Sequence, residues 1–356
     1  MNIFENKGWM TAPTYEERVF EAAQFFGKGR RGGPIAQAEV TEAFTTHDFP
    51  ILLGDAFTKK AIAAQKAAVD EFEPILASAT TPDLNRHKLV DLWGGDAFER
   101  VAEGEEYKGG TLNETELSHG TAKWGKSYGL TMELRLRRVF SDLANFPQYL
   151  GSGATKAKNN AVADVLATGT GWDTAFFGTI ATAAFEPDSL DAAIKALALR
   201  TDHRGDPVDV SNLILVHGPG LRGEVSRVLN AYEVEMSVTS GSKVTKTKVT
   251  NPFKGVVTPL ESRTIGAKLG SNAGTGWALV QGKSSTLPSL INTGLEGHDG
   301  DVDIRVKRDQ GESLGGGLVP VDKGSFNDDT IWYRGRTFFG IDKGFTTGVY
   351  ASNGQS

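Results

Sequence analysis

The chain has 356 residues, a formal net charge of −6 and no cysteine. Its length allows one or two globular cores, and its hydrophobic and charged shares of 39% and 23% are close to those of folded domains. The missing cysteines exclude disulfides, thiolate catalysis and cysteine-based metal sites, and the acidic balance disfavours non-specific binding of nucleic acids.

The N-terminal part shows no sustained hydrophobic period. Residues 1–54 mix short apolar clusters with glycine-rich and basic turns, so we expect an extended arm. No apolar stretch follows a basic start there, and no run of about 18 apolar residues occurs along the chain, which argues against a signal peptide and a membrane span. From Phe57 to Phe72 apolar residues recur at helical spacing, and Pro74 predicts the end of this helix.

The next segment has the most unusual composition of the chain. Its first half, about Leu92 to Lys108, and its second half, Lys123 to Thr131, look like the two arms of a long β-hairpin. Between Asp96 and Lys126 it carries seven acidic and four basic residues and few large apolar ones. An isolated two-stranded ribbon is marginal in water, so we expect the hairpin to lie on a neighbouring copy of the chain. The predicted subunit contacts are Trp93, Phe98, Arg100, Glu103, Glu105, Tyr107, Lys108, Trp124 and Lys126.

The middle of the chain combines helices with one buried strand. Small residues at helical spacing predict a helix over about 152–167, after a break in the pattern at Pro147. An N-cap pattern at Asp188 opens another helix. The apolar run 212–216 predicts a buried strand, and a glycine-rich turn leads from it into a helix over 221–231.

Beyond Tyr232 the helical pattern disappears. Residues 234–250 alternate valine with serine, threonine and lysine, and later segments are typical of short strands between glycine-rich turns. The last patterned strand covers 329–339 and precedes a polar tail. We therefore expect this second half of the chain to be mostly β-structure.

The turn Gly218-Pro-Gly-Leu-Arg-Gly223 matches the G-x-G-x-x-G pattern of dinucleotide sites, after a predicted strand and at a predicted helix start. Two features speak against a nucleotide. Pro219 lacks a backbone donor that could face a phosphate, and the acid expected about 20 residues later falls in a region of serine, threonine and lysine. A plain strand–turn–helix connection is therefore the preferred interpretation.

No other pattern indicates catalysis, a metal or a cofactor. The segment Gly282-Lys-Ser284 misses the spacing of a phosphate loop, and the aspartates of 299–303 lack the glycine and glutamate of a calcium loop. The six histidines contain no pair at i, i+4 for a zinc helix, and no G-x-S-x-G motif occurs. We predict no catalytic, cofactor-binding or metal-binding residues, and hence a protein that is not an enzyme.

The order of six segments along the chain is itself informative. These segments are Phe49–Gly54, Phe98–Lys108, Lys123–Thr131, Asp142–Gly151, Asn212–His217 and Asp329–Gly340. Together they resemble the major capsid proteins of tailed bacteriophages with the Hong Kong 97-like fold, especially the Mu-type branch of head subunits. Within this resemblance, Phe98–Lys108 is similar to the outgoing arm of the family's extended loop and Lys123–Thr131 to its returning arm. Asp142–Gly151 is similar to the lead into its spine helix.

The resemblance implies an α+β, Hong Kong 97-like capsid fold with an N-terminal arm, an extended β-hairpin loop, a peripheral domain with a long spine helix, and an axial β-rich domain. The implied segments are the arm over 1–54, a helix and connector over 55–85, the hairpin loop over 86–129, the peripheral domain over 130–230, the axial domain over 231–325, and a return strand of the peripheral domain with the tail over 326–356.

The resemblance also implies a virion capsid protein that self-assembles, in the bacterial host cytoplasm, into hexamers and pentamers of an icosahedral head shell. Its partners would be other copies of itself, scaffold, portal and decoration proteins, and packaged double-stranded DNA without sequence-specific contact, but no membrane. Two alternatives stay open. One is an encapsulin-like compartment shell around cargo protein, which has the same fold, and the other is a nucleotide-binding enzyme that uses residues 218–223.

Overall fold

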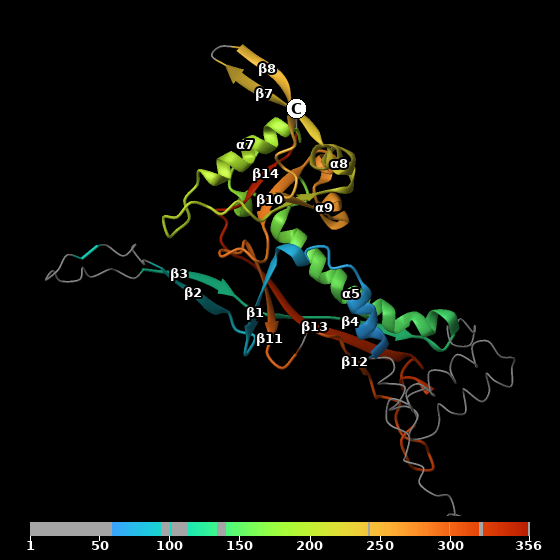
Figure 1. Cartoon of the computed structure of the whole chain (residues 1–356). Coiled ribbons are helices and arrows are strands. Elements are labelled where there is room, and N and C mark those ends of the chain that lie inside the picture. Colours follow the sequence, from blue (N-terminus) through green and yellow to red (C-terminus); the bar gives the residue numbers. More distant parts are fainter. Residues whose placement is uncertain are drawn as a thin grey trace, which may run out of the picture. The chain divides into compact units, whose positions relative to one another are not determined.

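The computed structural model describes residues 59–93, 100–101, 113–133, 140–240, 243–298, 300–319 and 323–354 (Figure 1). They fall into two compact units. Unit 1 comprises the described residues within Met1–Val69, Trp124–Thr155 and Asp301–Thr337, and unit 2 those within Asp70–Lys123, Lys156–Gly300 and Phe338–Ser356. Three elements contribute residues to both units: α5 (Phe140–Leu166), β4 (Ala122–Leu130) and β13 (Ile331–Lys343).

A five-stranded sheet lies at the centre of unit 2. Its strand order is β5 (Ile180–Ala181), β14 (Tyr350–Ser352), β10 (Trp277–Gln281), β6 (Leu213–His217) and β9 (Val257–Glu261). β6 pairs in parallel with β9 and antiparallel with β10. Every residue of β6 and β10 is buried, as expected for strands that are covered on both faces. The buried strand predicted at 212–216 is thus confirmed.

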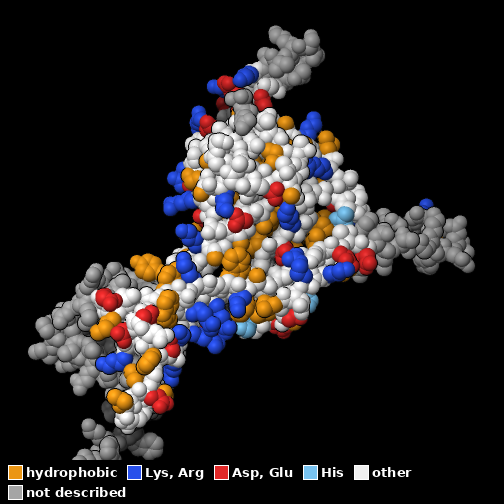
Figure 2. Space-filling model, turned by 180° about the vertical axis from the view of Figure 1, so that it is seen from behind, with side chains coloured by type: hydrophobic (Ala, Val, Ile, Leu, Met, Phe, Trp, Pro, Cys, Tyr) orange, Lys and Arg blue, Asp and Glu red, His pale blue; other side chains and the backbone are white. Residues whose placement is uncertain are grey.

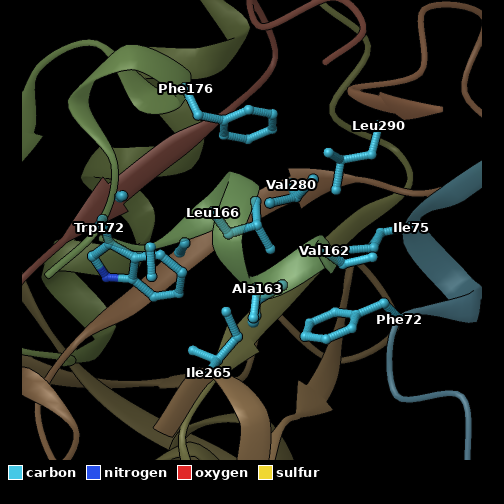
Figure 3. Packing of buried hydrophobic residues seen from close by; sticks show 14 of the residues in the cluster. Phe72, Ile75, Val162, Ala163, Leu166, Trp172, Phe176, Ile265, Val280 and Leu290 are labelled. Carbon is cyan, nitrogen blue, oxygen red and sulfur yellow. The ribbon is translucent and has the colours of Figure 1, made fainter. Parts of the chain in front are cut away.

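The side chains of β6 and β10 alternate between two hydrophobic cores, since successive residues of a strand point to opposite faces. Their odd-numbered apolar residues share one core with α7 (Pro187–Ala198) and α8 (Arg222–Asn230). Their even-numbered ones share the other with the end of α5 and with α9 (Arg263–Lys268). Figure 3 shows Leu166 of α5 and Val280 of β10 in this second core. The shorter helical elements are α6 (Thr174–Phe177) and the 3-10 turns Glu73–Ile75, Pro219–Leu221 and Gly270–Asn272.

A second five-stranded sheet joins strands that are far apart in the sequence, and its strands β1 and β11 belong to unit 2. β1 (Leu76–Thr81) pairs in parallel with β11 (Leu290–Leu295), which pairs antiparallel with residues 340–343 of β13. The helix predicted to end at Pro74 covers residues 59–67 instead, and Pro74 lies in a 3-10 turn before β1. This turn buries Ile75 in the core shared with α5.

Two antiparallel hairpins extend from the body of unit 2 in Figure 1. β7 (Glu233–Ser240) pairs with β8 (Lys243–Thr250), which confirms the alternating pattern at 234–250. β2 (His87–Trp93) pairs with β3 (Asn113–His119). The prediction of residues 123–131 as the returning arm was therefore wrong, because β4 pairs with β13 and not with β2. The two-residue period of a strand is the same whichever partner it meets, so the pattern could not distinguish the two pairings.

The described part of unit 1 includes the other strands of the second five-stranded sheet, the first part of α5 and the helix over 59–67. β12 (Asp303–Val306) and β4 pair with the first half of β13. The N-terminal part of α5 approaches the helix over 59–67 closely: a Cβ at Gly151 would lie 2.0 Å from the backbone oxygen of Ala61. Only a glycine permits this approach. Oε1 of Gln65 accepts a hydrogen bond from the backbone N–H of Val302 at 3.0 Å.

The helix predicted over 152–167 begins earlier. α5 runs from Phe140 to Leu166 and passes through Pro147, where the sequence predicted a break. A proline inside a helix costs about 3 kcal/mol, because it removes a hydrogen bond and crowds the preceding turn. Burial of Leu150, Val162 and Leu166 supplies tertiary packing that offsets this local cost.

The predicted boundary at 230/231 does not separate two sheets. β6 precedes it, while β9 and β10 follow it in the same sheet. Beyond Tyr232 most of the regular elements in the described residues are strands, as predicted. This region also contains α9, whose N-cap Ser262 accepts a hydrogen bond from the backbone N–H of Ile265 at 3.0 Å. The peripheral and axial assignments of 130–230 and 231–325 stay predictions. Among the helices in the described ranges, none combines the length and the apolar character that a membrane span needs.

Candidate subunit interface

The predicted contact residues are spread over different elements. Trp93 is the last residue of β2, and Arg100 lies exposed in the short stretch 100–101. Trp124 and Lys126 lie exposed on β4. Because the partner of β2 is β3, Trp124 and Lys126 do not lie opposite Trp93 as the predicted loop required. Outside the described residues lie Phe98, Glu103, Glu105, Tyr107 and Lys108.

One carboxylate of β13 anchors the base of the β2–β3 hairpin. Nη2 of Arg86 donates to Oδ1 of Asp342 at 2.7 Å, and the backbone N–H of Gly120 donates to Oδ2 at 3.0 Å. Arg86 also donates from Nε to Oγ of Ser118 at 2.9 Å. Asp342 therefore holds the residue before β2 and the residue after β3 at the same point.

The base of the hairpin is closely packed as well. His119, at the end of β3, is buried, and its Nδ1 lies 3.1 Å from Oγ1 of Thr293 on β11. A Cβ at Gly340 of β13 would lie 1.8 Å from the backbone oxygen of Gly120. The glycine at 340 is therefore required where β13 passes the turn between β3 and β4.

A second anchor holds the hairpin further along β2. Oδ1 of Asp91 accepts a hydrogen bond from Nη2 of Arg204 at 2.6 Å, and Oδ2 accepts one from Nε of Arg204 at 3.0 Å. Oδ2 also lies 2.8 Å from Nε2 of His203. A bidentate contact between arginine and carboxylate is among the stronger hydrogen-bonded pairs, and its geometry fixes both side chains.

The surroundings of this anchor favour the charged forms. Burial alone would raise the pKa of Asp91, but hydrogen bonds from Arg204 and His203 outweigh it, and the pKa lies below its ordinary value. The hydrogen bond to Asp91 raises the pKa of Arg204. The ring of His203 stacks on Phe345, with 4.5 Å between the centroids and 7° between the planes. The loop after α7 thus holds the hairpin on one side and packs on the C-terminal segment on the other.

The two faces of the hairpin differ. Asp91 points to the same face as the cross-strand pairs Leu89–Leu117 and His87–His119, which is the face that the contact with Arg204 holds. The other face, which we call the outer face, carries Lys88, Val90, Glu114 and Glu116, all exposed. Nζ of Lys88 lies 2.6 Å from Oε2 of Glu116, and this hydrogen bond raises the pKa of Lys88. Because the pair is exposed, it contributes little to stability and is free to exchange partners.

The glycine turn at 218–223 serves packing within the chain. β6 ends at His217, a 3-10 turn follows, and α8 begins at Arg222, which confirms the strand–turn–helix interpretation. A Cβ at Gly218 would lie 2.7 Å from the backbone oxygen of Ala273, and one at Gly220 would lie 2.9 Å from Cα of Gly274. The chain itself thus occupies the space in front of both glycines, where a pyrophosphate would have to approach.

A buried histidine precedes this turn. Nδ1 of His217 donates to the backbone oxygen of Gly218 at 2.8 Å, and burial lowers the pKa of the imidazole. In the described part of the chain, no group of three or more histidine, aspartate or glutamate side chains could hold a metal ion. His217 is therefore best explained as a neutral core residue that fixes the end of β6.

Sequence reasoning missed the residues that anchor the hairpin: Asp91, His203, Arg204 and Asp342. In the sequence each is an ordinary charge on a polar strand or in a polar loop. The contacts join residues that are 112 to 256 positions apart. No local pattern signals such a pair, and the alternation along 87–93 predicts only which residues share a face.

A family model described as phage capsid protein matches residues 114–352, which is more than half of the chain. No curated protein matches. The solved structures that resemble this chain include the mature capsid of bacteriophage PhiM1, with 12% identity, a TM-score of 0.45, and coverage of 79% of this chain and 86% of that chain. The structure of Gordonia phage Cozz has 14% identity and a TM-score of 0.45, and the match covers 77% of this chain and 84% of that chain. The holo-SrpI encapsulin complex from Synechococcus elongatus PCC 7942 has 10% identity and a TM-score of 0.42, and the match covers 78% of this chain and 84% of that chain.

The assignment rests on the family match, since the identities and TM-scores of these structures are low. It confirms the capsid family expected from the sequence, while the Mu-type branch stays a prediction. The mixture of helices and sheets confirms the α+β class. The chain belongs to the phage capsid protein family.

Proposed function

We propose that this chain is a major capsid protein with the Hong Kong 97-like fold, which self-assembles into hexamers and pentamers of an icosahedral head shell around phage DNA. The observation that carries the proposal is the family match over residues 114–352, which begins in β3 and ends in β14. A component of the virion capsid has to make contacts with other copies of itself.

The construction of the β2–β3 hairpin supports self-assembly. Asp342 fixes its base and Arg204 fixes its middle, so its direction from unit 2 is defined. Its outer face remains exposed. Contacts between different patches of identical subunits can close into rings and shells. Many such contacts, each weak, add up in a closed shell.

The proposal includes the remaining partners and the place of assembly. A scaffold protein, a portal and decoration proteins would join the shell, and double-stranded DNA would be packaged without sequence-specific contact. Assembly would take place in the cytoplasm of the bacterial host. The subunit would act as structural material and not as an enzyme, in keeping with a glycine turn at 218–223 that is filled by the chain itself.

The proposal is tested by electron microscopy of particles from cells that express the chain alone and together with its genomic neighbours. We expect uniform shells, or hexamers and pentamers, and DNA inside particles from infected cells. Shells filled with cargo protein and without DNA would favour the encapsulin-like alternative. A small oligomer under every condition, with saturable dinucleotide binding that Gly220→Val abolishes, would favour the enzyme.

A further inference from the structure

One face of the sheet in unit 1 is rich in arginine. In the register of β12 and β13, Arg305 lies directly opposite Arg334, and Asp303 lies opposite Arg336. Paired residues of antiparallel strands share a face, and so do residues two apart, which adds Trp332. We call Arg305, Trp332, Arg334 and Arg336 the arginine face. Figure 2, seen from behind the view of Figure 1, shows where lysine and arginine side chains, in blue, gather on the face that it draws.

The arginine face points away from α5. A Cβ at Gly335 would lie 3.1 Å from the side chain of Leu150 on α5, so the neighbouring residues Arg334 and Arg336 point to the opposite side. Arg305, Trp332 and Arg334 are exposed. Arginine and tryptophan are the side chains that are most enriched at energetically important protein contacts.

Positive charge exceeds negative charge on this face. Oδ2 of Asp303 accepts hydrogen bonds from Nε of Arg336 at 2.7 Å and from Nε of Arg305 at 3.1 Å. Within the described ranges no carboxylate lies at ion-pair distance from Arg334. Like charges directly opposite each other on neighbouring strands are destabilising. An anion bound between Arg305 and Arg334 would remove this repulsion, and guanidinium groups bind carboxylates with two hydrogen bonds.

The β2–β3 hairpin has the complementary charge. Residues 96–116 contain seven acidic and two basic side chains, a net charge of −5 in a chain whose total is −6. Of these acids, Glu114 and Glu116 lie on the outer face of the hairpin, both exposed. Val90, opposite Glu116 in the register, is 46% exposed and adds an apolar contact.

We propose that the arginine face of one copy binds the outer face of the β2–β3 hairpin of a second copy, with Glu114 and Glu116 at Arg334 and Arg305 and Val90 at Trp332. This contact rests on the proposed function, because it joins two different patches, as a shell requires. Phosphates of DNA are the other anion that could bind. The overall charge of −6 opposes the approach of DNA, whereas the hairpin brings the opposite charge with it.

Charge reversal tests the contact. We expect two variants, Arg334→Glu and the double variant Glu114→Lys with Glu116→Lys, each to reduce the yield of shells or capsomers at least about tenfold. Like charges then face each other at a contact that is repeated in every copy. A 1:1 mixture of the two variants restores the yield of hexamers, because the two variants can alternate in a ring of six and each copy then meets a complementary copy. Arg227→Glu, a reversal of an exposed side chain on α8, is the matched control and should assemble normally.

The outcomes separate this contact from its rivals. Normal assembly of both variants contradicts the contact. Rescue by combining all three substitutions in one chain, but not by mixing, would place the contact within a single chain. Normal shells of Arg334→Glu that lose affinity for duplex DNA would assign the arginine face to DNA. Failure of the unchanged protein to form shells would count against the proposed function itself.

A second measurement does not depend on shell formation. The chain has no cysteine, so introduced cysteines report on one contact alone. Val90→Cys and Trp332→Cys variants, mixed under mild oxidation, should give a disulfide-linked dimer on a non-reducing gel. As a control, Val90→Cys mixed with Leu199→Cys, an exposed residue after α7, should give none. Equal dimer yields in both mixtures would overturn the proposal.

Discussion

Asp91 of β2 and Arg204 of the loop after α7 form a bidentate ion pair, with distances of 2.6 and 3.0 Å between donor and acceptor atoms. The two residues are 113 positions apart in the sequence. Both side chains are mostly buried, at 21% and 28% exposure, so the pair is screened less than a surface pair. It makes the β2–β3 hairpin an extension of unit 2 with a defined direction.

Loss of this pair should loosen the hairpin. We expect Arg204→Ala to lower the free energy of local opening of β2 and β3 by about 1–3 kcal/mol, because it leaves the Asp91 carboxylate without its main partner. Hydrogen exchange of the amides of β2 and β3 measures this opening. Arg222→Ala, which removes an exposed arginine from its contact with Glu261, is the matched control. Equal protection in both variants would contradict the anchoring role.

The contact between Asp91 and Arg204 also shows which features the sequence could predict and which it could not. The apolar run at 212–216 and the alternation along 234–250 predicted strands, because both patterns are local. The partner of β4 and the anchor of Asp91 could not be predicted in this way, since both depend on residues from distant parts of the chain. Pro147 misled the prediction of α5 for a related reason: its local cost is visible in the sequence, and the packing that offsets it is not.

A methyl group at position 340 should disturb the base of the hairpin. In Gly340→Ala the new Cβ would lie 1.8 Å from the backbone oxygen of Gly120, so β13 or the turn must move. We expect a loss of about 1–3 kcal/mol in the free energy of unfolding, measured by denaturant titration. Gly315→Ala, where no atom lies within 4 Å of the new Cβ, should stay within about 0.5 kcal/mol of the unchanged protein.

The core next to α5 should be sensitive to a cavity. Leu166 has no exposed surface and lies in the core that Figure 3 shows. Leu166→Ala should therefore lower the free energy of unfolding by about 2–5 kcal/mol. Leu199→Ala removes the same atoms from a side chain that is 77% exposed, and should have little effect. Similar losses for the two variants in thermal or chemical unfolding would argue against this core.

Acid should destabilise unit 2 through His217. Burial lowers the pKa of His217 in the folded chain, so the unfolded chain binds more protons between the folded pKa and the ordinary value of about 6.5. Its contribution to stability is therefore present above about pH 6.5 and falls as the pH drops below that value. The free energy of unfolding, measured from pH 7.5 to 5, should decline less steeply in His217→Gln. Identical slopes would show that His217 does not titrate on unfolding.

The most direct test of shell building through the hairpin is negative-stain microscopy of a variant in which a short glycine–serine linker replaces residues 96–110. This change leaves β2, β3 and both anchors in place. We predict that the unchanged protein forms uniform shells or capsomers and that the variant remains a folded, unassembled subunit by sedimentation and circular dichroism. Shells of normal size and yield from the variant would contradict the account.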